Sequence, residues 1–178
     1  MIGLDHRVQR WVVEHRVSWL DQVFVWLSKL GAFGWVFLVI AAVAALVLRR
    51  PQVFVLTLAA AVVGDLVARG LQAATDRQRP PVLPGEPHRL VALPTSASFP
   101  SGHATVAFAC SVTLALAVPR LDVPVLMLAA AIAYSRVYLG VHYPLDVIAG
   151  ALLGTLIAIA LRQLVAVLTR RRRSPTPG

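Results

Sequence analysis

The sequence has few charged residues, almost no lysine and almost no cysteine. Only 14% of its 178 residues are charged, 58% are hydrophobic, and the mean hydropathy is +0.73. This composition is too apolar for a soluble domain of this size, and its apolar residues come in long blocks, which indicates a polytopic membrane protein. Cys110 is the only cysteine, which excludes an internal disulfide. Because no long soluble segment separates the blocks, we expect a single domain over residues 1–178.

Arginine carries almost all of the positive charge of the chain. The formal net charge is +9, and Lys29 is the only lysine. A basic protein can have nucleic acid as its partner. Here the arginines stand at the ends of apolar runs, and membrane topology explains that placement better. We therefore expect the bilayer as a partner and no nucleic acid, and the sequence leaves the oligomeric state open.

Five apolar runs are candidates for membrane helices. They cover residues 31–48, 52–74, 104–118, 123–139 and 145–168. A helix needs about 20 residues to cross the hydrocarbon core, so the third run must include Ser101 to His103 as well. Residues 17–30 are short and partly polar, and they form either a sixth span or an amphipathic helix at the interface. The sequence thus predicts an all-α membrane bundle of five to six transmembrane helices.

The two ends of the chain are expected to differ from this bundle. Charged side chains interrupt the apolar residues near the start, so we favour an amphipathic or membrane-edge helix within residues 1–30. Residues 169–178 combine an arginine cluster with Ser, Pro and Gly, and we expect a basic disordered tail there.

Basic residues predict the orientation of the bundle. If the five runs alternate, Arg49-Arg50, Arg120 and the cluster at 170–173 fall on one side, which the positive-inside rule makes cytoplasmic. The loop at 75–99 and the turn at 140–144 then face outward. The scarcity of lysine beside abundant Ala, Val, Leu and Arg suggests a bacterial chain. We therefore expect a multi-pass protein of the bacterial inner (plasma) membrane with these polar segments on the outer side.

A GxxxG pattern occurs at Gly150 and Gly154 in the last apolar run. Small residues at this spacing let two helices approach closely. We expect this contact to lie within the bundle rather than at a dimer seam.

A first polar island, Pro100-Ser101-Gly102-His103, precedes the third apolar run. Ser101 is a favourable N-cap for a helix that begins after it, and a helix N-terminus is a natural anion site. Gly102 would let a phosphate approach the backbone, and His103 in the first turn would be placed to donate a proton to a leaving oxygen. The same pattern also fits a simple cap followed by an interfacial histidine.

A second island contains Ser135-Arg136, His142 and Asp146. His142 and Asp146 are four residues apart, so the carboxylate can reach one ring nitrogen if the turn is close to helical. That contact would fix the tautomer and leave the other nitrogen as a nucleophile. A structural histidine held by a helix-capping aspartate would explain this pair, but it would not explain Arg136 or the second histidine at the same membrane face.

A third island, residues 76–80, ends in Arg79-Pro80. Arginine binds phosphate oxygens in a bidentate manner. Taken together, the three islands supply two arginines, a helix N-terminus and two histidines, one of which has a carboxylate partner. No carboxylate pair, cysteine set or histidine cluster has metal-ligand spacing. We therefore expect no metal and no cofactor, and phosphoryl transfer through a phosphohistidine fits this inventory best.

These motifs resemble those of the type 2 phosphatidic acid phosphatase (PAP2) family, which is also similar to vanadium haloperoxidases. The family signature is Lys, six residues, Arg-Pro; then Pro-Ser-Gly-His; then Ser-Arg, five residues, His, three residues, Asp. The second and third parts match in full at residues 100–103 and 135–146. In the first part, Arg79-Pro80 matches but Gln72 stands where the family has lysine, and Arg69 and Arg77 are possible substitutes for that cation.

The resemblance implies a role for each matching residue. Phosphate oxygens would be held by Arg79, Ser101, Gly102 and Arg136. His142 would attack phosphorus, with Asp146 orienting its ring, and His103 would protonate the leaving lipid oxygen and then activate water. The substrate would be a lipid phosphate or diphosphate, with polyprenyl diphosphate, phosphatidylglycerophosphate, phosphatidic acid and a phosphorylated sugar lipid as candidates.

Two other functions compete with the phosphatase. A non-catalytic lipid-phosphate binder or transporter on the same scaffold is favoured only by Gln72, and the intact His103, His142 and Asp146 argue against it. A haloperoxidase would need vanadate in the site, and the membrane setting argues against that reading.

Overall fold

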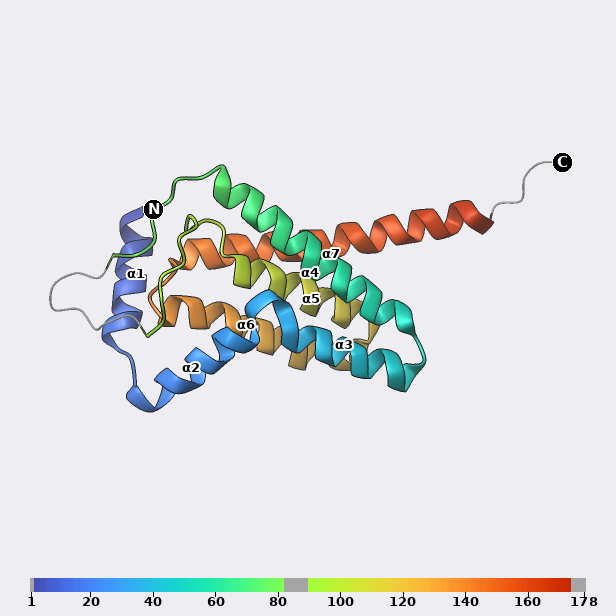
Figure 1. The fold of residues 1–178 in the computed structure, drawn as a ribbon, viewed down its shortest axis with the longest axis horizontal. Helices are drawn as coiled ribbons and strands as arrows, with labels where there is room; N and C mark the ends of the chain where they lie inside the picture. Colours follow the sequence, from blue (N-terminus) through green and yellow to red (C-terminus); the bar gives the residue numbers. More distant parts are fainter. Residues whose placement is uncertain (1, 82–89, 174–178) are drawn as a thin grey trace.

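The computed structural model describes residues 2–81 and 90–173, which form a bundle of α-helices (Figure 1). The helices are α1 (Ile2–Glu14), α2 (Ser18–Leu30), α3 (Trp35–Leu48), α4 (Pro51–Ala73), α5 (Gly102–Ala117), α6 (Asp122–Tyr138) and α7 (Pro144–Arg173), with short 3₁₀ turns at η1 (Ala32–Gly34) and η2 (Pro119–Leu121). No strand occurs among these residues. The prediction of an all-α membrane bundle is confirmed.

Helix α5 forms the centre of the bundle and contacts α3, α4, α6 and α7. Its buried Val106, Cys110 and Leu114 pack with Phe37 of α3 and Ile132 of α6. Large apolar side chains on the outer faces of the surrounding helices are exposed instead: Val43, Leu46, Val55, Leu66, Met127, Ile148, Leu152 and Leu156. An apolar outer face around a packed interior is what a lipid environment requires, and the chain is a multi-pass membrane protein.

Fewer helices meet the length requirement of a membrane span than the sequence predicts. Within the described residues, three helices (Pro51–Ala73, Pro119–Tyr138 and Pro144–Arg170) are long and apolar enough, and α2 with α3 would add a fourth as one span bent by 58°. Five to six were expected. The difference arises because α3 has 14 residues and α5 has 16, which is below the length of about 17 that a span needs.

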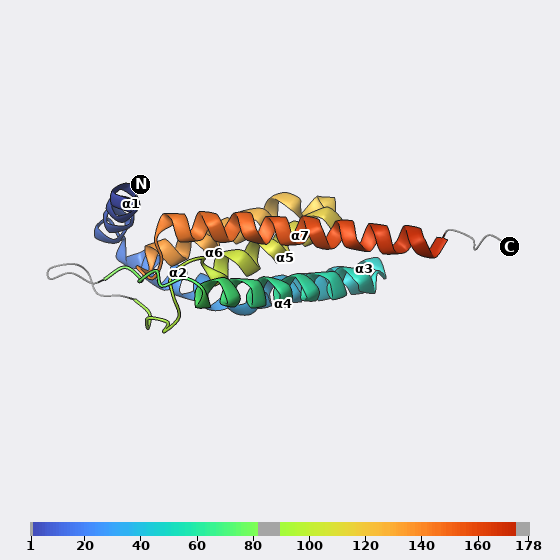
Figure 2. The same cartoon turned by 90° about the horizontal axis from the view of Figure 1, so that it is seen from above.

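The N-terminal region forms two helices rather than one. Residues 15–17 separate α1 from α2, and α1 lies across one end of the bundle (Figures 1 and 2). Helix α2 leads into the bend at η1, where Phe33 and Gly34 have positive φ angles of 51° and 72°. At the other end, α7 continues to Arg173, so residues 169–173 are helical instead of forming the start of a disordered tail. Residues 174–178 of the predicted tail lie outside the described residues.

The turns between helices divide into two groups, one at each end of the bundle. The α3–α4 and α5–α6 connections and the end of α7 lie at one end (Figures 1 and 2). They contain Arg49, Arg50, Arg120 and the arginines that begin at Arg170. The segment between α4 and α5, the α6–α7 turn and α1 lie at the opposite end. All three polar islands therefore meet at the end opposite Arg49-Arg50, Arg120 and the arginines that begin at Arg170.

Gly150 and Gly154 place α7 directly against α5. A Cβ atom at Gly150 would lie 2.6 Å from the carbonyl oxygen of Ser101, and one at Gly154 would lie 2.2 Å from the carbonyl oxygen of Thr105. The GxxxG pattern is thus an internal helix contact. Because this contact includes Ser101, it also fixes the first turn of α5 next to the first turns of α7.

We expect Gly154→Ala to destabilise the protein, because the new methyl group would meet backbone atoms that cannot rotate away. Overpacking of this kind lowers the free energy of unfolding by about 1–3 kcal/mol. Thermal unfolding in detergent, followed by tryptophan fluorescence, measures the effect. Gly70→Ala on α4 is the matched control, because a Cβ atom there has nothing within 4 Å. Equal melting temperatures for the two variants would contradict the close α5–α7 contact.

Candidate active site

A cavity of about 710 Å³ opens at the end of the bundle where the three polar islands meet. Apolar and polar side chains from the η1 break, α4, the segment before α5, α5, α6 and the α6–α7 turn surround it. Its lining consists of Ala32, Phe33, Asp65, Ala68, Arg69, Gln72, Ala73, Arg79, Pro94, Ser96, Ala97, Gly102, His103, Val106, Arg136 and His142. Five of the predicted site residues (Arg79, Gly102, His103, Arg136 and His142) thus line one cavity.

The α6–α7 turn holds His142 and Asp146 against each other. The backbone N–H of His142 donates to the carbonyl oxygen of Arg136 at 3.2 Å, and the N–H of Tyr143 donates to Oδ2 of Asp146 at 2.9 Å. The imidazole Nδ1 lies 3.5 Å from the same Oδ2. This separation exceeds an ordinary hydrogen bond, and catalytic hydrogen bonds commonly tighten only when a substrate is bound.

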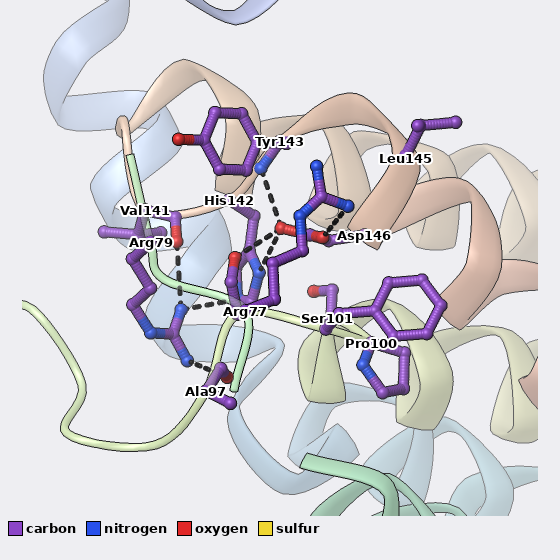
Figure 3. A network of polar contacts seen from close by, with 12 residues as sticks. Arg77, Arg79, Ala97, Pro100, Ser101, Val141, His142, Tyr143, Leu145 and Asp146 are labelled. Carbon is purple, nitrogen blue, oxygen red and sulfur yellow. Dashed lines mark hydrogen bonds and ion pairs between the residues drawn. The ribbon is translucent and has the colours of Figure 1, made fainter. Parts of the chain in front are cut away.

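Arg79 contacts the other side of the imidazole and thereby defines its tautomer (Figure 3). Its Nη1 lies 2.9 Å from Nε2 of His142. Because a guanidinium can only donate hydrogen bonds, Nε2 must be the acceptor and the ring proton must reside on Nδ1, facing Asp146. Further bonds to the carbonyl oxygens of Ser96, Ala97 and Val141 hold the guanidinium in place. His142 therefore presents a lone pair, rather than a proton, toward the cavity.

Burial and charge keep His142 neutral. The side chain is 2% exposed, and burial lowers its pKa from the ordinary 6.5 to about 4. The charges of Arg79 and Arg136 contribute to this lowering of the pKa, whereas Asp146 opposes it. Burial also lowers the pKa of Arg79 from its ordinary value, and the charge of Asp146 opposes that shift. At neutral pH the site thus combines an unprotonated imidazole with a nearby cation.

The start of α5 brings Gly102 and His103 into the cavity. The hydroxyl of Ser101 accepts from the N–H of Ala104 at 3.5 Å, which agrees with the predicted N-cap. Ser101 is fully buried and is absent from the described lining of the cavity, while its own N–H donates to the carbonyl oxygen of Asp146 at 2.9 Å. His103 lies in the first turn of α5 and lines the cavity. The helix N-terminus and the second histidine are therefore beside His142.

Arg136 projects from the end of α6 into the same cavity. Only 4% of its surface is exposed, and its Nη1 donates to the hydroxyl of Ser28. Its Nε is buried without a hydrogen-bond partner. A buried donor that lacks a partner costs roughly 1–3 kcal/mol or more, so this guanidinium is suited to an anion that would accept from it.

Gln72 and the two possible substitutes for the family lysine, Arg69 and Arg77, occupy different positions. Gln72 lines the cavity, but its Nε2 donates to the carbonyl oxygen of Pro100 at 2.8 Å. Arg69 also lines the cavity, with Nε 2.7 Å from Oδ2 of Asp65, and 71% of its side chain is exposed. Arg77 is not among the lining residues. Its guanidinium forms ion pairs with two carboxylates on the far side of His142, so it does not take the place of the lysine.

Sequence reasoning missed three polar residues that support the site. The hydroxyl of Ser98 donates to Oδ2 of Asp146, the hydroxyl of Ser28 accepts from Arg136, and Asp5 pairs with Arg77. Asp5 is one of several charged residues in α1, and nothing in the sequence distinguished it or the two serines. Among the described residues, no group of three or more His, Cys, Asp or Glu side chains is arranged to hold a metal ion.

Comparison with known sequences agrees with the motifs. A sequence profile described as the PAP2 superfamily matches residues 50–170, which contain every predicted site residue. The chain belongs to the PAP2 superfamily. The motifs that resemble the family signature therefore lie in a genuine PAP2 domain.

Similar PAP2-type proteins include enzymes that act on several lipids. The chain is 30% identical over 158 residues to an undecaprenyl-diphosphatase of Sulfolobus acidocaldarius, covering 88% of this chain and 76% of the relative. It is 36% identical over 134 residues to a decaprenylphosphoryl-5-phosphoribose phosphatase of Mycobacterium tuberculosis, covering 72% and 71%. The crystal structure of a PAP2-type phosphatidylglycerolphosphate phosphatase from Bacillus subtilis superimposes with a TM-score of 0.77 and 26% identity, covering 92% of this chain and 85% of that one.

We expect inorganic phosphate to stabilise this PAP2 protein by binding beside Arg136. At 100 times its Kd, a ligand that binds only the folded state adds about 2.7 kcal/mol to the free energy of unfolding. The melting temperature in detergent should therefore rise with phosphate concentration, and Arg136→Gln should remove the rise. Arg162→Gln, a change on α7 outside this cavity, serves as the control and should respond like the wild type. A phosphate response that survives Arg136→Gln would show that the anion binds elsewhere.

Proposed function

We propose that this protein hydrolyses a lipid phosphate or diphosphate through a phosphohistidine on His142. The observation that carries the proposal is the position of His142 between a carboxylate and a cationic cavity. Its Nδ1 faces Asp146, and its unprotonated Nε2 faces Arg79 at 2.9 Å. A neutral imidazole held in the correct tautomer is an activated nucleophile.

In the first proposed step, Nε2 of His142 attacks phosphorus in line, and the bond from phosphorus to the leaving oxygen breaks. Arg79 exchanges its contact with Nε2 for a phosphate oxygen, and Arg136 uses its unpartnered Nε for another. Both guanidinium groups then stabilise the charge that spreads over the phosphoryl oxygens. His103, in the first turn of α5, is protonated when the anionic substrate is bound and gives that proton to the leaving oxygen.

In the second proposed step, water replaces His142 on phosphorus. His103 has lost its proton and accepts one from the attacking water, so the two steps together return it to its starting state. The bond between Nε2 and phosphorus breaks, and inorganic phosphate leaves. The imidazole of His142 becomes positively charged during transfer, and the negative charge of Asp146 stabilises that form.

The location of the cavity supports a lipid as substrate. It opens at one end of a membrane bundle, and its lining includes the apolar side chains of Ala32, Phe33, Ala68 and Val106, which suit an acyl or prenyl chain. Arg49-Arg50, Arg120 and the arginines that begin at Arg170 lie at the opposite end, and by the positive-inside rule this arrangement supports a site on the outer side of a bacterial inner membrane. We propose this orientation, with a polyprenyl diphosphate, phosphatidylglycerophosphate, phosphatidic acid or phosphorylated sugar lipid as substrate.

Non-catalytic binding or transport of a lipid phosphate is the second candidate. It is favoured by Gln72, which contributes no charge where the family signature has lysine and whose amide is engaged by Pro100. Loss of that cation weakens transition-state stabilisation without preventing binding to Arg79 and Arg136. Turnover measurements therefore decide between the two candidates.

We expect detergent-purified protein to release phosphate from a panel of lipid phosphates and diphosphates in excess chelator, and His142→Ala to lower kcat by at least about 10³-fold because the nucleophile is gone. His15→Ala is the matched control, since that histidine is exposed on the N-terminal segment, and it should retain full activity. The ranking of the panel identifies the substrate class. Turnover by folded His142→Ala near the wild-type rate would exclude the phosphohistidine, and no turnover by wild type would favour the binding protein.

We also expect kcat/KM to lose activity at low pH with a midpoint near pH 4 instead of near 6.5; we call this part of the pH profile the acid limb. Protonation of Nε2 removes the nucleophile, and burial lowers the pKa of His142 to about 4, so activity should persist down to about pH 5. Below the pKa, kcat/KM should fall about tenfold per pH unit. Samples held at low pH and assayed at pH 7 separate titration from irreversible unfolding. If kcat/KM instead begins to fall near pH 6.5, then either His142 is not the titrating nucleophile or water surrounds its imidazole and burial does not lower its pKa.

A further inference from the structure

Asp5 is a buried carboxylate in α1 with no role in the motifs. Its side chain is 1% exposed, although α1 lies across the end of the bundle and exposes Leu4, Val8 and Trp11 (Figure 1). Burying an ionised carboxylate is costly unless it is paired and hydrogen-bonded. The partners of Asp5 come from two segments far away in the sequence, and both segments belong to the active site.

The first partner of Asp5 is Arg77. One terminal nitrogen of this guanidinium pairs with Oδ2 of Asp5, and the other lies 2.8 Å from Oδ1 of Asp146. The guanidinium also lies over the ring of Tyr143, 4.8 Å from its centroid, and His6 stacks against the same ring at 4.3 Å. Arg77 is thus fixed as a bridge between the carboxylate of α1 and the carboxylate that faces His142.

The second partner of Asp5 is the first turn of α7. Its Oδ1 accepts from the backbone N–H of Leu145 at 2.9 Å. The first N–H groups of a helix have no partner within the helix, and a carboxylate there also complements the helix dipole. Asp5 therefore caps α7 across space, in the turn that carries Asp146 (Leu145 and Asp146 are labelled in Figure 3).

We propose that Asp5 is a positioning residue of the active site, which holds Arg77 and the first turn of α7 so that Asp146 faces His142. The proposal rests on the proposed function, because it concerns the same nucleophile. It makes α1 a part of the catalytic apparatus as well as a helix at the membrane edge.

The arrangement has a charge signature that simple packing would lack. Asp5, Arg77 and Asp146 carry a combined charge of −1, and Asp146 is the member of this trio that faces His142. The other charged or titratable groups that act on this imidazole are Arg79 from the segment before α5, Arg136 from α6 and His103 from α5. Removing the charge of Asp5 leaves the trio neutral, and removing that of Arg77 leaves it at −2. Negative charge favours the protonated imidazole, so the two changes must shift the pKa of His142 in opposite directions.

The experiment compares Asp5→Asn, Arg77→Gln and the double variant in the full-length protein. Asn keeps an acceptor for Leu145 while losing the charge. We expect Asp5→Asn to lower kcat about tenfold with KM within twofold, because Asp146 is less well placed in the transition state. We expect the titration midpoint of His142 to fall by about half a pH unit in Asp5→Asn, to rise similarly in Arg77→Gln, and to return to the wild-type value in the double variant.

Two measurements report the titration midpoint of His142 in each variant. One is the acid limb of kcat/KM, and the other is NMR of ¹⁵N-histidine-labelled protein, with the His142 signal identified by its loss in His142→Ala. Glu14→Gln, on the exposed end of the same helix, is the charge control and should leave kcat and both readouts unchanged. Asp5→Glu keeps the charge, so it should retain the wild-type midpoint even if its longer side chain lowers kcat.

Unshifted midpoints, or shifts of the same sign in both single variants, would overturn the proposal and leave Asp5 with a packing role. If Asp5→Asn does not fold, a wild-type midpoint in Arg77→Gln overturns it equally. The proposed function fails separately, when wild-type protein releases no phosphate. In that case the NMR midpoints alone decide whether Asp5 and Arg77 act on His142.

Discussion

The buried carboxylate of Asp146 is the group on which the geometry of the site depends. It has no exposed surface, and its oxygens contact Nδ1 of His142, the N–H of Tyr143, the hydroxyl of Ser98 and the guanidinium of Arg77. A buried carboxylate is tolerated only with such a set of donors, so each of these contacts restrains the segment that supplies it. Its backbone carbonyl also accepts from Ser101, which fixes the first turn of α5 beside that of α7.

Charge is arranged asymmetrically around the imidazole. The carboxylates of Asp146 and Asp5 lie on one side of His142 with Arg77 between them, whereas Arg79 and Arg136 lie on the side of the cavity. Arg136 donates to the hydroxyl of Ser28, and its Nε lacks a partner. A phosphate in the cavity would supply the missing negative charge. The arrangement thus favours binding of an anion and, in the proposed mechanism, stabilises both the equatorial oxygens and the developing imidazolium.

The motif residues could be predicted from the sequence because their spacing reflects local structure. Ser101 caps α5 as predicted, and the turn before α7 brings His142 and Asp146 together across four residues. The support for these residues could not be predicted, since Ser28, Ser98 and Asp5 reach the site only through tertiary packing. Asp5 and Leu145 are 140 positions apart, and no periodicity in α1 specifies that contact. The sequence also could not show that α5, with 16 residues, would be enclosed by its neighbours.

Gln72 changes how a phosphate would have to be held in this PAP2 protein. Its amide donates to the carbonyl oxygen of Pro100, which ties α4 to the residue before the Ser101 cap, and it adds no charge. Arg69 cannot make the same tie, because its guanidinium is directed to Asp65 and most of it is exposed. The cations of the matching motifs that line the cavity are therefore Arg79 and Arg136. Three carbonyl oxygens fix Arg79, and α2 supports Arg136 through Ser28, so anion binding depends on the segment at 96–97 and on the helix that precedes the η1 bend. In a chain with the family lysine, a third cation would also contact the phosphate oxygens. Here any displacement of α2 is transmitted directly to one of the two groups that would hold the phosphate.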